Sequence, residues 1–152
     1  MSSPARCRGV TLVELIVTIV VVAVAVSGVL ALVSATAARS AENMQQVQAV
    51  AIAESYLNEI LQKPFGVDCT PCTRTQMDKV GDYNGLVDVG AHDATGSPVT
   101  NLGSYTVQVT VTNSALGAGP AVPAAQSELV TVTVTTPNGQ TAALSGYRTL
   151  YP

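Results

Sequence analysis

Few side chains in this sequence are suited to chemistry, and those few lie apart. His92 is the only histidine, so a catalytic or metal site built on histidines is hard to assemble. Cys69 and Cys72 form a C-x-x-C pair in the stretch DCTPC. Glu14 lies near the start of the most apolar run of the chain, where an unpaired charge is costly.

The C-x-x-C pair has several interpretations. In an exported, oxidising setting Cys69 and Cys72 are expected to form a local disulfide, which stabilises only modestly because the loop is short. A redox-active pair would need a thioredoxin-like βαβ setting, which the sequence does not provide. A zinc site would need two further ligands, and only His92 is an obvious one. Free thiols are the last alternative.

A loose acidic group follows between residues 79 and 96. Oxygen ligands at such spacing can bind calcium, but the EF-hand pattern is missing. Loops rich in Asp, Asn and Gly are ordinary turn chemistry. We therefore predict neither a metal site nor a cofactor. The members of the group are Asp82, Asn84, Asp88 and Asp93.

Composition and motifs argue against an enzyme. The 152 residues suffice for one modest domain plus an anchor, with 47% hydrophobic and only 11% charged residues. The sequence contains no G-x-S-x-G, H-E-x-x-H, P-loop or G-x-G-x-x-G motif. Glu54 and Glu59 fall on a predicted helix without a predicted pocket. The net charge of -3 and the lack of a basic patch argue against nucleic-acid binding.

Residues 10–33 form an apolar run that is long enough to span a membrane as a helix. A bilayer core requires about 20 such residues as a helix, and lipid favours a helix over an open strand. Arg6 and Arg8 precede the run. By the positive-inside rule, the N-terminus is predicted to be cytoplasmic and the chain beyond the run is predicted to be exported. A secretory signal cleaved near residues 35–37 and a plain signal anchor are the alternatives. The run is about twice the length of a usual signal-peptide core.

The residues around Glu14 form a more specific pattern. A short leader with Arg6 and Arg8 ends in Gly9, and the stretch VTLVE then leads into the apolar run. This arrangement resembles the type III signal of type IV pilins and pseudopilins, although Val10 stands where that family usually has Phe. The resemblance implies cleavage after Gly9 by a prepilin peptidase and N-methylation at Val10. It also implies that Glu14 pairs with an N-terminal amine during filament assembly.

Beyond Arg39 the apolar residues recur with helical periodicity along one side. The helix is expected to end at Lys63, because Pro64 follows. One helix over residues 10–63 is the simplest prediction, and two helices with a break at residues 39–43 are the alternative. The predicted apolar side consists of Ala49, Val50, Ala53, Tyr56, Leu57 and Ile60. The predicted polar side consists of Gln48, Ala51, Glu54, Ser55, Asn58, Glu59 and Gln62.

The C-terminal half alternates apolar and polar residues. Residues 105–112 and 130–135 are predicted to be half-buried strands, with a loop over residues 113–126 between them. A turn at residues 137–139 leads into a returning strand over residues 140–150. We therefore predict an α+β, pilin-like fold. Its long N-terminal helix, membrane-spanning and then amphipathic, packs on a small antiparallel sheet.

The predicted organisation has four parts. Residues 1–9 are a leader that is removed, and residues 10–33 are the transmembrane half of the helix. Residues 34–63 are its amphipathic half. Residues 64–152 are an exported globular domain with a loop region and the antiparallel sheet.

The pilin resemblance implies a minor type IV pilin, held in the bacterial inner membrane and then incorporated into a pilus. Its implied partners are other pilin subunits, the prepilin peptidase and the inner-membrane assembly platform. Residues 49–65 and the stretch DYNG at residues 82–85 resemble the MshD-like minor pilins of the mannose-sensitive haemagglutinin (MSHA) pilus and PilV-like proteins. The alternatives are a type II secretion pseudopilin and an anchored, exported binding domain.

Overall fold

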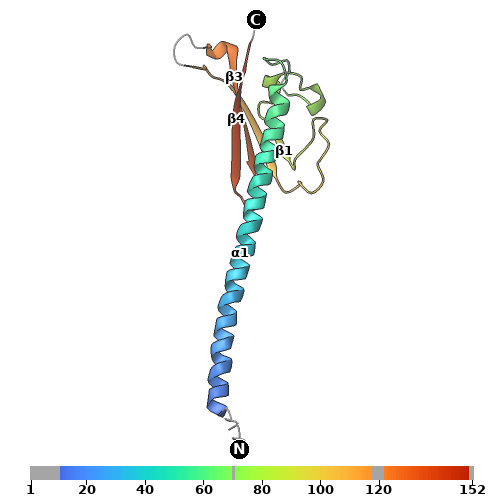
Figure 1. Ribbon diagram of the computed structural model, residues 1–152. Helices are drawn as coiled ribbons and strands as arrows, with labels where there is room; N and C mark the ends of the chain where they lie inside the picture. The colour runs from blue at the N-terminus through green and yellow to red at the C-terminus, as the bar shows by residue number, and fades with distance from the viewer. Residues whose placement is uncertain (1–10, 70, 118–121, 151–152) are drawn as a thin grey trace, which may run out of the picture. The chain divides into compact units, whose positions relative to one another are not determined.

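The computed structural model describes residues 11–69, 71–117 and 122–150. The chain divides into two compact units, Met1–Ala41 and Glu42–Pro152. One helix, α1 (Leu12–Leu61), contributes to both units and continues without interruption through residues 39–43. The prediction of a single long helix is therefore confirmed, and α1 ends two residues before the predicted Lys63 (Figure 1).

Hydrogen bonds within α1 satisfy the hydroxyl groups of Thr18 and Ser27 in its apolar half. The hydroxyl of Thr18 donates to the carbonyl oxygen of Glu14 at 2.7 Å, and that of Ser27 donates to Val24 at 2.8 Å. Hydroxyl groups bonded in this way need no water, which suits a helix in an apolar environment.

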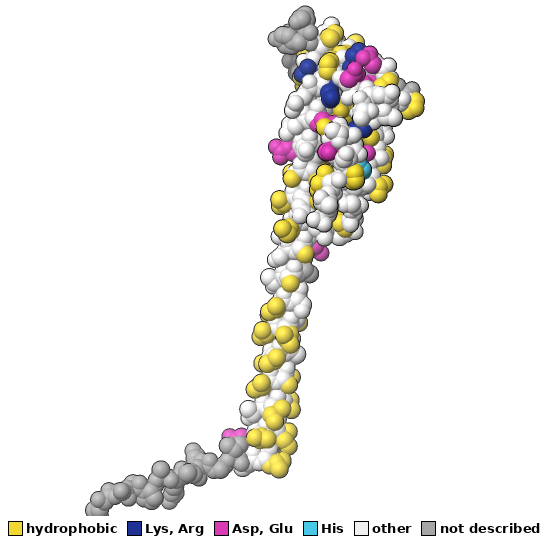
Figure 2. Space-filling view, turned by 90° about the vertical axis from the view of Figure 1, so that its right-hand side faces the viewer, with side chains coloured by type: hydrophobic (Ala, Val, Ile, Leu, Met, Phe, Trp, Pro, Cys, Tyr) yellow, Lys and Arg dark blue, Asp and Glu magenta, His cyan; other side chains and the backbone are white. Residues whose placement is uncertain are grey.

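The N-terminal half of α1 exposes its hydrophobic side chains on all sides. Leu12 is 75% exposed, and none of the most apolar 18-residue stretch of the helix is buried. Figure 2 shows these side chains along the helix. By length and composition, α1 is one helix that could cross a membrane.

In the second unit, residues 42–61 of α1 pack on the sheet through one apolar stripe. Ala53 and Ile60 are fully buried. The prediction for Val50 was wrong, since this residue is 39% exposed, and the predicted face omitted Ile52, which is buried. Each residue turns the helix by about 100°, so Val50 lies beyond the edge of a stripe centred on the buried residues. That stripe consists of Ala49, Ile52, Ala53, Tyr56 and Ile60.

The sheet has four strands in the order β1-β2-β3-β4, and every neighbouring pair is antiparallel. The strands are β1 (Val87–Val89), β2 (Thr106–Asn113), β3 (Ser127–Thr135) and β4 (Thr141–Thr149). Val109, Val132 and Leu144 lie side by side across the three long strands. The valines of β2 and β3 that face α1 are buried, whereas the threonines between them face outward.

The three predicted strands are confirmed, but β1 was not predicted. Its sequence, VDV, is too short to show an alternating pattern. The predicted loop between β2 and β3 contains a short 3₁₀ helix, Ala124–Gln126, and a bridge between Leu116 and Val122. Residues 118–121 of that loop lie outside the described residues.

We expect Val132→Ala to lower the free energy of unfolding by about 2 kcal/mol, because it removes fully buried methyl groups and leaves a cavity. Thr133→Ala, next to it on the outer face, should change stability by less than about 0.5 kcal/mol. Urea unfolding of the two variants measures the difference. Equal losses would contradict the finding that Val132 faces the core and Thr133 faces outward.

Candidate functional site

The N-terminal candidate site is only partly within the described residues. Gly9 and Val10, the predicted cleavage and methylation positions, lie outside them. Glu14 is in the first turn of α1, and its backbone N–H donates to the hydroxyl of Thr11 at 3.3 Å. Thr11 and Glu14 thus have the T-x-x-E spacing of a capping box, and a carboxylate in the first turn also interacts favourably with the helix dipole.

The carboxylate of Glu14 is exposed to solvent. Within residues 11–69, 71–117 and 122–150, no side chain forms a hydrogen bond or an ion pair with it. Residues 15–38 carry no charge, so α1 offers no cation within reach of Glu14 on its C-terminal side. The carboxylate can therefore stabilise the start of the helix, and it is also available to bind a group from another chain.

A second candidate site lies inside the globular domain, around Arg74. Its guanidinium pairs with Glu59 of α1 at 3.0 Å and with Asp88 of β1 at 3.1 Å. The same guanidinium lies over the rings of Tyr56 and Tyr83, 4.8 and 5.5 Å from their centroids. The Arg74 side chain is only 9% exposed, so these contacts replace most of its hydration.

The two tyrosines complete this cluster. Tyr56 donates to Asp88 at 2.8 Å, and Tyr83 donates to Glu59 at 2.9 Å. Burial raises the pKa of both phenols, and the neighbouring carboxylates add to the effect, so both stay protonated donors. Because each acid already has an arginine and a tyrosine as partners, the cluster is built to hold elements together and not to transfer protons.

Sequence reasoning missed Arg74. It placed Glu59 on the solvated side of α1, whereas Glu59 is largely buried by its partners. The i, i+3 spacing of Tyr56 and Glu59 shows that both lie on one side of the helix, but it does not indicate that Arg74 contacts them.

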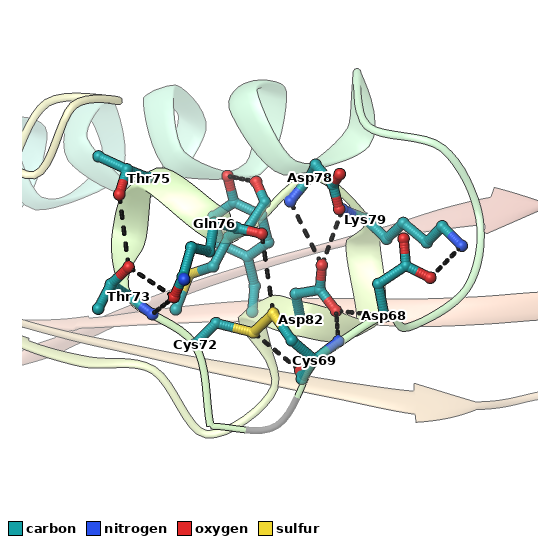
Figure 3. The surroundings of a disulfide bond; sticks show 11 residues. Asp68, Cys69, Cys72, Thr73, Thr75, Gln76, Asp78, Lys79 and Asp82 are labelled. Atoms are coloured by element: carbon teal, nitrogen blue, oxygen red, sulfur yellow. Dashed lines mark hydrogen bonds and ion pairs between the residues drawn. A yellow bond between two sulfur atoms is a disulfide. The ribbon is translucent and has the colours of Figure 1, made fainter.

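The C-x-x-C loop is organised around Asp82. In the structure a disulfide joins Cys69 to Cys72 (Figure 3). One oxygen of Asp82 accepts the N–H groups of Asp68 and Cys69 at 2.7 and 3.0 Å. The other oxygen accepts those of Asp78 and Lys79 at 3.3 and 3.0 Å.

These bonds decide the charge state of Asp82. Its burial alone would raise the pKa of the carboxyl, but the four backbone N–H donors together lower it below the usual range. Asp82 is therefore ionised at neutral pH although only 5% of the residue is exposed. The carboxylate fixes the loop on both sides of the disulfide.

The same geometry explains why the loop is a poor metal site. The sulfurs of Cys69 and Cys72 and a carboxylate oxygen of Asp82 lie within 4.8 Å of one another. Sulfurs joined in a disulfide are not thiolate ligands, and each oxygen of Asp82 already accepts two hydrogen bonds.

The acidic group considered for calcium is divided among separate partners. Asp82 binds the loop backbone, and Asp88 binds Arg74 and Tyr56. The amide oxygen of Asn84 accepts the N–H of Val111 at 2.9 Å. The carboxylate of Asp93 accepts hydrogen bonds from Thr95 and Ser97 within its own turn. Each oxygen group thus stabilises a different part of the fold.

His92 lies beside an open groove of about 430 Å³. Its backbone N–H donates to the hydroxyl of Tyr56 at 2.8 Å, and its Nδ1 lies 3.1 Å from the carbonyl oxygen of Gly90. The groove is lined mainly by apolar side chains of α1 and of residues 91–102, including Ile52 and Leu102. Beyond His92, Tyr56 and Ser55 it holds no titratable or nucleophilic group.

The architecture described above is pilin-like: a long N-terminal helix, apolar and then amphipathic, packed on an antiparallel sheet. Comparison with protein families finds a match to the prokaryotic N-terminal methylation motif over residues 4–35. The match is confined to the N-terminal part of the 152-residue chain. It includes Gly9, Val10 and Glu14 and the whole apolar run over residues 10–33. No curated protein and no solved structure matches the chain.

The motif and the fold together support a type IV pilin-like or pseudopilin-like protein. The motif indicates a prepilin processed by a peptidase, and with the one apolar N-terminal helix it suggests membrane anchoring. A structural subunit, not an enzyme, fits both observations.

We expect Asp82→Asn to lower the free energy of unfolding by about 2 kcal/mol at pH 7, because four backbone donors lose a charged acceptor. The pKa of Asp82 is lowered by folding, so its stabilisation is complete above the unfolded value near 4 and is lost at lower pH. The difference between wild type and variant should therefore shrink in urea titrations below about pH 4.

Asp78→Asn is the matched control, because Asp78 is exposed and only its backbone contacts Asp82. It should leave stability nearly unchanged at every pH. A pH-independent loss in Asp82→Asn would show that the charge is not what stabilises the loop.

Proposed function

We propose that this chain is a minor type IV pilin, a membrane-anchored subunit that is cleaved by a prepilin peptidase and joins or primes a pilus. The methylation motif over residues 4–35 carries the proposal. Its residues run in the order of a basic leader, a glycine and an apolar helix with an acid in the first turn, and this order supports such processing and assembly.

Cleavage after Gly9 changes the electrostatics of the N-terminus. It removes Arg6 and Arg8, whose charges hold the leader on the cytoplasmic side. The net charge falls from -3 to -5, because Lys+Arg drops from 7 to 5 while Asp+Glu stays at 10. A new amine appears on Val10, four residues and about one helical turn before Glu14.

Glu14 then supplies the assembly contact. A carboxylate in an apolar environment is costly unless it is paired. In the unassembled subunit it lies at the helix start, close to the membrane surface, where water and the helix dipole stabilise it. In a filament core it needs a cation, and the N-terminal amine of a neighbouring subunit provides one. This requirement aligns neighbouring helices along their axes.

The exposed apolar side chains of α1 provide the bulk of the packing. They surround the helix, so the segment suits lipid before assembly and neighbouring helices after it. The globular domain, with its disulfide and its threonine-rich outer face, is displayed on the exported side.

Within the pilin class, the resemblance of residues 49–65 and 82–85 to MshD-like and PilV-like proteins favours a minor pilin. The second candidate is a type II secretion pseudopilin, which would have the same leader, cleavage position, acid and apolar helix. Co-purification with pili, as opposed to a secretin-linked secretion apparatus, separates the two. An exported binding domain that is merely anchored is the third, and it requires no processing at Gly9.

Expression of the full chain in a host with a prepilin peptidase should give an N-terminus at Val10. Intact-mass measurement should show one added methyl group and, for the oxidised Cys69–Cys72 pair, the loss of two hydrogen atoms. A host lacking the peptidase is the control and should retain the leader. A chain starting at Ala38 would point to conventional secretion, and a leader retained in both hosts would point to a plain anchor.

Glu14→Ala should leave membrane insertion and cleavage intact but reduce incorporation into filaments by roughly 100-fold or more. An unpaired buried partner charge costs about 3–5 kcal/mol, and each 1.4 kcal/mol is a factor of ten. Quantitative immunoblotting of sheared pili measures the loss. Glu42→Ala, which removes an exposed acid further along α1, should incorporate normally. Equal incorporation of the Glu14 variant and wild type would exclude the assembly role.

A further inference from the structure

The β4 edge of the sheet carries unused backbone groups. Thr136 N–H bonds to Gln140 C=O, and Leu150 N–H bonds to Gln126 C=O, both at 2.8 Å. These bonds lie at the two ends of the β3–β4 ladder, and antiparallel pairs alternate between bonded and non-bonded. The even-numbered residues of β4 therefore bond to β3. The odd-numbered residues direct N–H and C=O groups to the free edge: Thr141, Ala143, Ser145, Tyr147 and Thr149.

The β1 edge is open in the same way. Val109 N–H bonds to Leu86 C=O at 2.9 Å, and Gly90 N–H bonds to Tyr105 C=O at 2.7 Å. By the same alternation, Asp88 bonds to β2, while the backbone groups of Val87 and Val89 point away from the sheet. The side chains of these two valines are 55% and 77% exposed.

The outward backbone groups at both edges have no partner within residues 11–69, 71–117 and 122–150. The β4 edge also lacks the features that prevent strand addition. It pairs with β3 over nine consecutive residues without a bulge, contains no proline or lysine, and has Arg148 as its only charge. An edge of this kind accepts another strand readily. In Figure 1 β4 is the outermost strand on its side of the sheet.

The direction of the strands identifies the partner. Because neighbouring strands are antiparallel across all four, β1 and β4 also run in opposite directions. Two copies standing side by side in the same orientation therefore bring β4 of one antiparallel to β1 of the next. We propose that the β4 edge binds the β1 edge of a second copy of this chain, which extends the sheet from one subunit into the next.

The common orientation of the copies rests on the proposed function, because both domains then emerge from one membrane. Pairing of β4 with β4 of a second copy would also be antiparallel, but it reverses residues 42–61 of α1 in the second copy. That chain would enter its domain from the opposite side, which a shared membrane forbids. The head-to-tail contact also leaves a free edge at each end, so it can continue along an assembly.

The side chains at the proposed contact are compatible. Val87 and Val89 of one copy come beside Ala143, Ser145 and Tyr147 of the other on the outer face of the sheet. None of these side chains is charged, so the approach buries apolar area without separating ion pairs. The short length of β1 makes the contact weak in solution, and confinement in a membrane raises its occupancy.

The test uses the full chain in membranes of a host with a prepilin peptidase, with two differently tagged copies. One copy carries Ser145→Cys and the other carries Val87→Cys, and a short bismaleimide joins neighbouring thiols. We expect cross-linked dimers that contain both tags. We expect at least roughly tenfold less product when both copies carry Ser145→Cys, since a head-to-tail contact does not place these residues together.

A proline tests the backbone groups themselves. Ala143→Pro in the Ser145→Cys copy removes an outward N–H without breaking a bond to β3. It should reduce the cross-linked product by roughly tenfold, the effect of about 1.4 kcal/mol in lost hydrogen bonds. Ala143→Thr keeps the N–H and should leave the yield unchanged. Val89→Pro makes the same removal on the β1 side, so the result does not depend on one variant folding.

Dimers formed mainly between two Ser145→Cys copies would overturn the proposal in favour of β4–β4 pairing. The absence of any product from chains that start at Val10 would overturn it as well. A mixed dimer from chains that keep their leader would support the sheet contact and refute the pilin processing. Determining the N-terminus of the cross-linked band therefore separates the two proposals.

Discussion

The packing of one stripe of α1 against the valine rows of the sheet is the interaction on which the globular domain depends. Tyr56 lies in that stripe and continues it into the Arg74 cluster, where its hydroxyl contacts Asp88 of β1. Through Glu59 and Tyr83, the same cluster attaches the loop after α1 to the helix. Apolar burial thus fixes the sheet, and the buried arginine fixes the loops on it.

The stretch DYNG at residues 82–85 illustrates how a short motif can describe a fold more than a function. Asp82 organises the C-x-x-C loop, Tyr83 is buried in the Arg74 cluster, and the side chain of Asn84 accepts a hydrogen bond from β2. Gly85 has a φ of 82°, in the left-handed region that favours glycine. Every position of the stretch thus has a structural task in this fold.

The sequence predicted the features that rest on periodicity. The long helix and the strands β2 and β3 show repeating apolar patterns, and the turn at residues 137–139 indicated a returning strand, β4. The bounds of α1, β2 and β4 lie within two residues of those predicted, whereas β3 begins three residues earlier than predicted. β1 and the Arg74 cluster were missed because they depend on contacts between distant residues. Nothing local in the sequence indicates that Arg74 reaches both Glu59 and Asp88. Glu14 was singled out because its spacing from Gly9 is itself a local pattern, and its assembly role stays a prediction.

Charged residues are few in both the apolar half of α1 and the globular domain. The chain has only 17 charged residues, 7 basic and 10 acidic, and several are used inside the globular domain. Glu59 and Asp88 share the one positive charge of Arg74, and backbone N–H groups bind Asp82. Burial raises the pKa of Glu128, while the N–H of Gly66 opposes that rise. The outer sheet face carries no charge, and Glu14 is the one charge of the apolar half of α1. In the proposed assembly, neighbouring copies would therefore meet little electrostatic repulsion at these surfaces, and Glu14 is the one group there that would need a cation.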